Sequence, residues 1–251
     1  MPFPGQTRLL ISPHMKGAAH FISPGLCEFE EMAFVSHFLR PADWFVDVGA
    51  NVGAYTLLAS GVAGAKTLAI EPSPSTYQYL LRNIRLNDLA EKVTPLNAAL
   101  GRAEGRTRLT DGLGTENYVS PGGNPSEGIE VRVSSLDSVS QDRRPKLIKI
   151  DVEGFETEVI AGAERTLHEL TLEAMIIERA GNASRYGYDE AALHRLVQDH
   201  AFIPCAYSVA DRSLKRLGPD DAGNIIYVRD IESAEKRLRT ATAFTFRGSS
   251  I

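Results

Sequence analysis

The fold is decided by the stretch Trp44–Gly53, which reads WFVDVGANVG. Its first residues form a short apolar run, typical of a β-strand that is buried on both faces of a sheet. Gly49 follows this run directly, and Gly53 lies in the turn into the segment 51–60, which has helical spacing. Glycines there permit a tight turn and a close approach of backbone to ligand. We expect the exposed N–H groups of this turn to favour a negatively charged group.

Strands and helices alternate outward from this stretch. Apolar runs predict strands at 67–70, 93–100, 146–150 and 174–177, an alternating run predicts a half-exposed strand at 129–133, and late strands are predicted at 207–209 and 224–228. Helical periodicity covers 28–39, 75–86, 156–169 and 190–199, whereas 101–128 predicts loop and a short hairpin. This alternation indicates an α/β fold with a doubly wound, mostly parallel, Rossmann-like sheet.

The length of 251 residues suits one large domain with additions at its ends. We expect an N-terminal lead-in and first helix at 1–40, with the lead-in acting as a lid. The Rossmann-like domain should occupy 41–230, and a C-terminal tail 231–251. The apolar helix near the N-terminus could pack on a second copy, so a homodimer is one interpretation.

Composition and charge exclude several classes of partner. Lys and Arg number 27 against 32 Asp and Glu, a net charge of −5, which argues against a nucleic-acid-binding surface. No apolar stretch approaches the roughly 18 residues of a membrane helix. The first residues lack the apolar core of a signal peptide. We therefore expect a cytoplasmic protein that acts on a small molecule, without nucleic acid or membrane.

Glu71 ends the strand that follows the glycine turn, about 20 residues further along the chain, where an acid accepts hydrogen bonds from ribose hydroxyls. The turn and Glu71 together indicate an adenine nucleoside cofactor, either NAD or S-adenosylmethionine. A dinucleotide fingerprint needs a glycine where Asn51 stands. The Asp47 carboxylate would attract a sulfonium cation and repel a pyrophosphate. Both features favour S-adenosylmethionine over the alternative of an NAD(P)-dependent oxidoreductase.

Several motifs occur together in this sequence: Asp47–Gly53, Glu71–Pro74 with Asn83 and Asn87, Ser135–Asp137, Ile148–Gly154 (IKIDVEG) and Ile176–Glu178. In these motifs the chain resembles the FkbM family of methyltransferases. The resemblance implies a class I methyltransferase fold and O-methylation of a hydroxyl on a sugar or natural-product scaffold. Residues beyond about 186 and the loop 110–128 match the family poorly, so we expect them to select the acceptor. A non-catalytic nucleoside-binding module of the same fold is a second alternative.

The resemblance also implies roles for individual residues. The methionine part of the cofactor would be lined by Asp47, Gly49, Asn51 and Gly53 with Tyr55 and Thr56 beside it, the ribose would meet Glu71 and Pro72, the adenine would lie near Asn97 and Ala98, and Asp151 would lie close to the reacting methyl group. Glu28 falls where the family usually has an acid. Tyr118, in the variable loop, could line the acceptor pocket.

Methyl transfer to a hydroxyl also needs a group that removes the hydroxyl proton. Acids at predicted strand ends supply the candidates Asp151, Glu153 and Glu178. Asp151 and Glu178 could instead bind Mg²⁺, which accepts carboxylates and waters. Glu153 could alternatively cap the helix that starts near Glu156.

Overall fold

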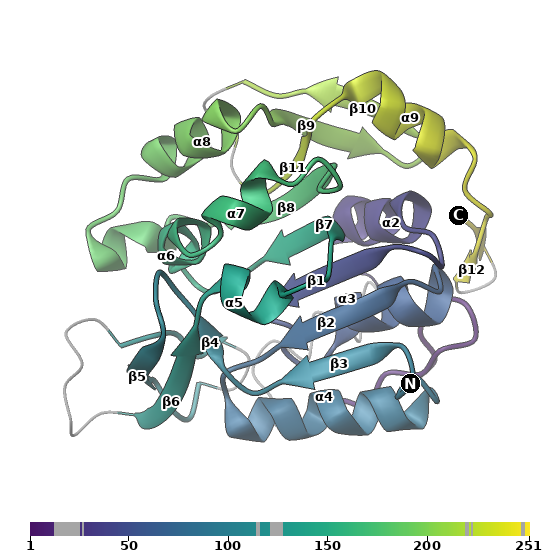
Figure 1. The fold of residues 1–251 in the computed structure, drawn as a ribbon. Helices are drawn as coiled ribbons and strands as arrows, with labels where there is room; N and C mark the ends of the chain where they lie inside the picture. The colour runs from purple at the N-terminus through teal and green to yellow at the C-terminus, as the bar shows by residue number, and fades with distance from the viewer. Residues whose placement is uncertain are drawn as a thin grey trace.

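The computed structural model describes residues 1–12, 26, 28–113, 116–120, 128–218, 221, 223–246 and 249–251. Its main sheet has the strand order β10-β9-β11-β8-β7-β1-β2-β3 (Figure 1). The strands are β1 (Trp44–Val48), β2 (Lys66–Ile70), β3 (Val93–Leu96), β7 (Pro145–Ile150), β8 (Ala174–Arg179), β9 (Ile203–Ser208), β10 (Ser213–Arg216) and β11 (Gly223–Val228). The run from β8 to β3 is parallel throughout, while β11 is antiparallel to both its neighbours.

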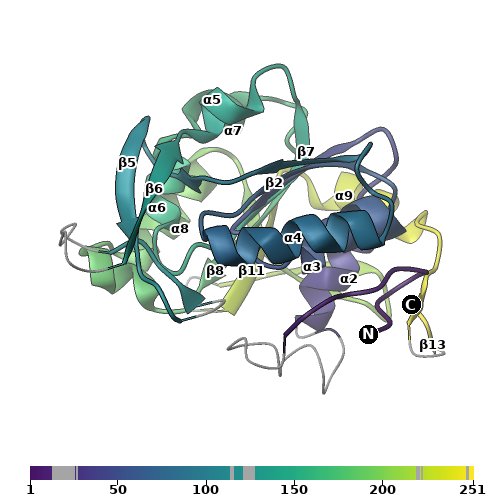
Figure 2. The same cartoon turned by 90° about the horizontal axis from the view of Figure 1, so that it is seen from below.

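Helices cover both faces of this sheet, which confirms the doubly wound prediction (Figure 2). One face packs on α2 (Phe29–Phe38), α3 (Ala54–Leu57), α4 (Pro74–Leu86) and α9 (Ile231–Arg239), and the other on α5 (Leu136–Ser140), α6 (Glu156–Ala161), α7 (Glu164–His168) and α8 (Glu190–Asp199). A π-helix, η1 (Leu58–Val62), continues α3, and a 3₁₀ helix, η4 (Asn182–Tyr186), follows β8.

A second, three-stranded sheet lies beyond the carboxyl ends of β1, β2 and β3 (Figure 1). It consists of β4 (Ala99–Leu100), β5 (Gly105–Leu109) and β6 (Ile129–Ser134), in the order β4-β6-β5. A small apolar core of its own, which includes Leu109 and Val131, holds it together. A hairpin of β12 (Thr245–Phe246) and β13 (Ser249–Ser250) lies near the C-terminus.

The late strand expected at 207–209 is β9, which begins at Ile203, and three further predicted elements differ from the structure for a local reason. The strand expected at 93–100 divides after Leu96, because the Asn97 side chain bonds the carbonyls that follow β2 and the chain turns into the second sheet. The helix expected at 156–169 breaks at Gly162, where a Cβ would lie 2.1 Å from the Gly101 carbonyl oxygen. The helix expected from residue 51 begins at Ala54, since Gly53 has a φ of 96°.

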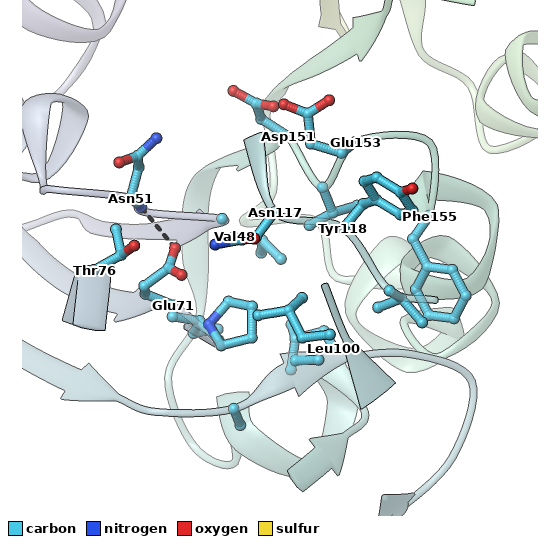
Figure 3. A pocket seen from close by; sticks show the side chains of 18 residues that line it. Val48, Asn51, Glu71, Thr76, Leu100, Asn117, Tyr118, Asp151, Glu153 and Phe155 are labelled. Carbon is cyan, nitrogen blue, oxygen red and sulfur yellow. Dashed lines mark hydrogen bonds between the residues drawn. The ribbon is translucent and has the colours of Figure 1, made fainter. Parts of the chain in front are cut away.

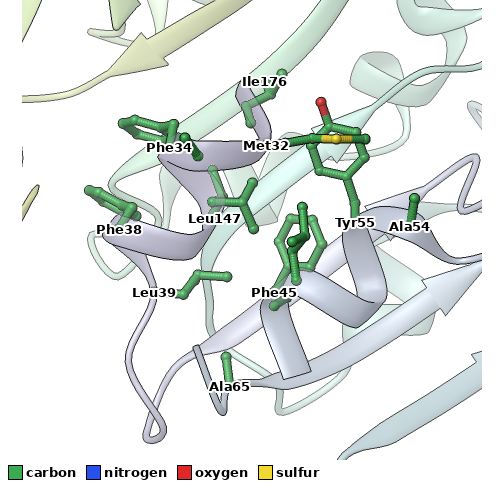
Figure 4. Packing of buried hydrophobic residues seen from close by; sticks show 14 of the residues in the cluster. Met32, Phe34, Phe38, Leu39, Phe45, Ala54, Tyr55, Ala65, Leu147 and Ile176 are labelled. Carbon is green, nitrogen blue, oxygen red and sulfur yellow. The ribbon is translucent and has the colours of Figure 1, made fainter. Parts of the chain in front are cut away.

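Apolar side chains of α2 lie inside the main core rather than on the surface. Met32, Phe34 and Phe38 are essentially unexposed and pack near Leu147 and Ile176 of the central strands (Figure 4). The apolar face of α2 is therefore covered within the chain, and a homodimer stays a prediction. No helix among the described residues is long and apolar enough to span a membrane.

The described part of the lead-in, residues 1–12, is held by two asparagines of α4. The Asn83 side chain accepts a hydrogen bond from the Leu10 backbone N–H (2.7 Å) and donates to the Leu10 carbonyl (3.0 Å) and the Val52 carbonyl (2.8 Å). Asn87 makes the matching pair of bonds with the Arg8 backbone. Asn83 therefore joins the lead-in to the glycine turn. A lid role for the lead-in stays a prediction, because 13–25 lies outside the described residues.

We expect Asn83→Ala to lower the free energy of unfolding by roughly 2–3 kcal/mol, because it leaves buried backbone groups without partners. For a chain of this size that loss lowers Tm by roughly 5–10 °C. The matched control Asn87→Ala removes hydrogen bonds that are largely exposed, so it should cost about 1 kcal/mol or less. Thermal unfolding of the two variants measures the difference. Equal effects would contradict the role given to Asn83.

Candidate functional site

The carboxyl ends of β1, β2 and β7 meet at one pocket (Figure 3). Its open space, including the part that faces solvent, is about 690 Å³. Among the predicted site residues the pocket is lined by Gly49, Asn51, Glu71, Pro72, Ala98, Asp151 and Glu153. Lining residues that we did not predict include Thr76, Leu100, Leu109, Asn117, Val119, Val152 and Phe155. A ligand site at the carboxyl edge of a parallel sheet agrees with the general rule for open α/β folds.

The turn after β1 is possible only with glycine at position 49. Gly49 has a φ of 79°, and a Cβ there would lie 1.8 Å from the backbone oxygen of Asp151. Gly53 has a φ of 96°, and its Cβ would lie 2.7 Å from Leu80. The backbones that follow β1 and β7 therefore pass in direct contact, which brings the Asp151 side chain to the same pocket as the turn.

The N–H groups of this turn are bonded within the chain, contrary to our expectation that they would be exposed. Gly49 and Ala50 donate to the Ile70 carbonyl at 3.0 and 2.9 Å. Asn51 donates to the Glu71 carboxylate at 3.0 Å, and Val52 to the Asn51 side-chain oxygen at 2.8 Å. The turn thus shapes the pocket floor, while its N–H groups are occupied.

Glu71 is held in place by the backbone on both sides of the pocket. Its carboxylate accepts a hydrogen bond from the backbone N–H of Asn51 at 3.0 Å (Figure 3). Its other oxygen accepts one from the backbone N–H of Ser73 at 2.8 Å. Each oxygen can accept a further hydrogen bond. Burial raises the pKa of Glu71 to about 7, opposed by these two N–H groups. The result is a fixed carboxylate that can receive two hydroxyl groups from the pocket.

Other predicted cofactor residues lie behind the pocket wall. Asp47, Gly53, Tyr55 and Thr56 are absent from the described lining. Asp47 is 1% exposed and accepts a hydrogen bond from the Thr56 hydroxyl at 2.6 Å. Burial raises its pKa to about 6, with the positive charge of Lys149 acting in the opposite direction. Asn97 also lies outside the lining, and its amide donates to the Glu71 and Pro72 carbonyls. Asp47 and Thr56 are buried, whereas Asn97 is exposed, and contact of these residues with the cofactor stays a prediction.

Lys149 is a residue that our sequence reasoning missed. Its ammonium group lies 2.6 Å from the Asp151 carboxylate and 4.5 Å from the centre of the Tyr55 ring. The nearby acids Asp151, Glu28 and Asp47 raise its pKa despite its burial. Glu28 accepts a hydrogen bond from the Tyr55 hydroxyl at 2.5 Å, which links α2 to this cluster. The sequence carried one sign that Lys149 is unusual, because it stands between two isoleucines in a strand that is predicted to be buried.

The three candidate bases differ in position. Asp151 and Glu153 line the pocket, whereas Glu178 does not belong to its described lining. Burial and the neighbouring Asp151 raise the pKa of Glu153 to about 7. Burial, Asp151 and Glu153 raise the pKa of Glu178 well above its usual range.

The alternative role of Glu153 as a helix cap is wrong. The Glu156 carboxylate accepts from the turn N–H groups of Val152 and Gly154, both at 3.1 Å. Glu153 instead accepts a hydrogen bond from the Asn182 amide at 3.1 Å. Its carboxyl group is thus held at the pocket without serving the helix.

The outer wall of the pocket comes from the variable loop and its neighbours. Tyr118 lines the pocket, as the sequence suggested, and the Arg185 guanidinium stacks on its ring at 3.8 Å. The Tyr186 hydroxyl donates to the Val119 carbonyl at 2.7 Å, and the Tyr186 ring packs edge-on against Phe155. Arg185 and Tyr186 of η4 therefore hold the loop at Tyr118 and Val119. Residues 114–115 and 121–127 of the loop lie outside the described residues.

A family model identifies the family of this chain, and the curated relatives are methyltransferases. A family model described as "Methyltransferase FkbM domain" matches residues 47–204. Methyltransferase sdnD from Sordaria araneosa is 29% identical over 53% of this chain and 65% of its own length. Hexuronic acid methyltransferase AglP from Haloferax volcanii is 28% identical over 49% of this chain and 51% of its own length. The chain thus spans about half to two thirds of the curated relatives that it matches.

A solved structure supports the fold. The crystal structure of methyltransferase FkbM from Methylobacillus flagellatus superposes with a TM-score of 0.52 and 21% identity, over 76% of this chain and 44% of that chain. At this identity the likeness concerns the fold alone.

Gly49→Ala should lower the free energy of unfolding by more than about 3 kcal/mol, because its Cβ meets a backbone oxygen and φ is positive. The matched control is Gly105→Ala, where a Cβ meets nothing within 4 Å. That control should change stability by less than about 1 kcal/mol. Denaturant unfolding of both variants provides the comparison. A stable Gly49→Ala protein would show that the two turns are not in direct contact.

Proposed function

The chain belongs to the FkbM family of methyltransferases, and from this premise we propose that it transfers a methyl group from S-adenosylmethionine to a hydroxyl group of a small molecule, a sugar or a natural-product scaffold. The observation that carries the proposal is a single pocket that contains the glycine turn, the fixed Glu71 carboxylate and Asp151. S-adenosylmethionine would supply an activated methyl group on a cationic sulfur. The chain's own residues would bind and orient the two reactants.

Glu71 is suited to recognise the ribose. Its two oxygens are fixed by backbone N–H groups and each has room for one more donor, so together they match a pair of hydroxyls. Ala98 and Leu100 supply an apolar side of the same pocket, which suits the flat adenine ring. Asp151, at the end of β7, would lie toward the reacting methyl group.

The turn itself argues against an NAD(P)-dependent oxidoreductase. A dinucleotide needs free N–H groups and a close backbone approach for its pyrophosphate. Here the N–H groups of Asn51 and Val52 are bonded to side-chain oxygens, and the Glu71 carboxylate adds negative charge beside them. A pyrophosphate would therefore meet a carboxylate in place of donors.

We assign proton removal to Glu153. Its carboxyl group lines the pocket next to Asp151, and its raised pKa places its ionisation near neutral pH, where a general base is most effective. Glu178 lies outside the described lining and serves as the second candidate.

A magnesium-dependent mechanism stays a prediction with little support from the geometry. The Asp151 carboxylate is already paired with the Lys149 ammonium, which would repel a divalent cation. Within the ranges that the structure describes, His, Cys, Asp and Glu do not form a group of three that could hold a metal ion.

The acceptor class rests on the relatives and on the pocket. The curated relative from Haloferax volcanii is named for the methylation of a hexuronic acid, which supports a sugar as acceptor. The outer wall offers an aromatic ring, Tyr118, and the Asn117 amide beside acidic groups, a combination suited to a polyhydroxylated ring. The variable loop would choose among such acceptors.

We expect S-adenosylhomocysteine to raise Tm, because a ligand at about 100 times its Kd stabilises the folded state by about 2.7 kcal/mol. For a chain of this size that corresponds to roughly 5–10 °C. NAD should give no shift. Glu71→Ala should abolish the shift through loss of the ribose acceptor. Differential scanning fluorimetry measures all three. A shift with NAD and none with S-adenosylhomocysteine would refute the proposed cofactor.

The pH profile tests the assignment of the base. A base acts only when deprotonated, so kcat/KM for the acceptor should rise with pH through about 7, the pKa of Glu153. S-adenosylmethionine is kept saturating, so that Glu71, whose pKa is also about 7, is already occupied by the cofactor. Glu153→Gln should lower kcat by about 100-fold and remove this rise. Glu178→Gln should retain the rise, because its own pKa is higher. If Glu178→Gln removed the rise and Glu153→Gln retained it, the base would be Glu178.

A further inference from the structure

Lys149 belongs to a polar layer on one face of the central sheet. It is the register partner of Asp47 on the adjacent strand β1, so their side chains leave the sheet on the same side. This side is the one covered by α2 and α3, where Leu147 and Phe45 lie in the main core. The ammonium group is therefore surrounded by apolar packing at the point where both strands end.

The position of the ammonium group is fixed by two contacts. It donates to the Asp151 carboxylate at 2.6 Å, and the face of the Tyr55 ring covers it at 4.5 Å. The Lys149 side chain is 3% exposed, whereas that of Asp151 is 27% exposed. The lysine is thus closed off from water, and the carboxylate that it holds reaches the pocket.

Stability alone gives little reason to keep such a pair. Replacing a buried ion pair by well-packed apolar residues of similar volume is often neutral or stabilising. A buried charge that is retained therefore favours a role in geometry. The Asp151 backbone is already fixed by its N–H bond to the Val48 carbonyl at 3.0 Å and by its contact with Gly49. Its side chain is the part that still needs an anchor.

We propose that Lys149 is a positioning residue, whose ammonium group holds the Asp151 carboxylate in the orientation that the methyl transfer requires. It does so from behind the pocket wall and without touching either reactant. The positive charge of Lys149 also offsets the negative charge of Asp47. The carboxylates of Asp47 and Asp151 therefore share one cation. This inference rests on the proposed function.

A double-mutant cycle tests the proposal. The wild-type chain is first assayed with radiolabelled S-adenosylmethionine against a panel of methyl glycosides and methyl glucuronosides, and the accepted panel member is used for every variant. Lys149→Met and Asp151→Asn should each lower kcat by at least about tenfold while changing the KM for S-adenosylmethionine by less than about threefold. The double variant should be no more than about threefold slower than the slower single variant, because Lys149 acts through Asp151.

Lys146→Met is the matched control. Lys146 lies on the same strand and makes an ion pair with Glu173 at 2.7 Å, at the opposite end of β7 from the pocket. Its loss should change kcat by less than about twofold. If Lys149→Met does not give a cooperative melting transition, Lys149→Leu takes its place in the same cycle, since it also removes both the charge and the donor.

Two results would overturn the proposal. One is a Lys149 variant that turns over within about threefold of the wild-type rate, and the other is a double variant whose loss equals the product of the two single losses. Failure of the proposed function looks different. In that case the wild-type chain itself neither binds S-adenosylhomocysteine nor methylates any member of the panel, and this inference falls with it.

Discussion

The backbone turn after β1 passes against the backbone turn after β7 so closely that no side chain fits between them. Glycine at position 49 satisfies this constraint, because any Cβ would overlap the Asp151 carbonyl oxygen. Parallel pairing of β1 with β7 and β2 then determines where the next side chains lie. Glu71 arrives from one neighbouring strand and Asp151 from the other, and both face the same pocket. The site is thus a consequence of strand order and one glycine.

Buried acids set the electrostatic character of the pocket. Burial raises the pKa of Asp47, Glu71 and Glu153 toward neutrality, and the described lining contains no Lys or Arg to offset them. Lys149 supplies positive charge from behind the wall. Such a site favours a cationic sulfonium over an anionic pyrophosphate, which is the preference that the family implies. Each acid is also held by a specific donor, so the negative charges have defined positions.

Much of the fold and part of the site could be predicted from the sequence. Apolar runs gave the central strands, since strands buried on both faces are continuous in apolar residues. Local patterns could not show where a strand changes sheets, because the division after Leu96 depends on the long-range hydrogen bonds of Asn97. Motif matching predicts that Asp47 and Thr56 lie beside the cofactor; the structure buries both outside the described pocket lining, and their contact with the cofactor stays a prediction. The role of Lys149 could not be predicted, because it depends on the register between Lys149 and Asp47. Only the pairing of β7 with β1 shows that register.

The central claim is that one pocket takes the nucleoside between Glu71 and Asp151. A crystal structure of the chain with S-adenosylhomocysteine tests it most directly. The account predicts the ribose hydroxyls on the Glu71 carboxylate, the adenine beside Ala98 and Leu100, and the sulfur directed toward Asp151. Density for the nucleoside at any other place, with Glu71 still bonded to the backbone alone, would contradict the account.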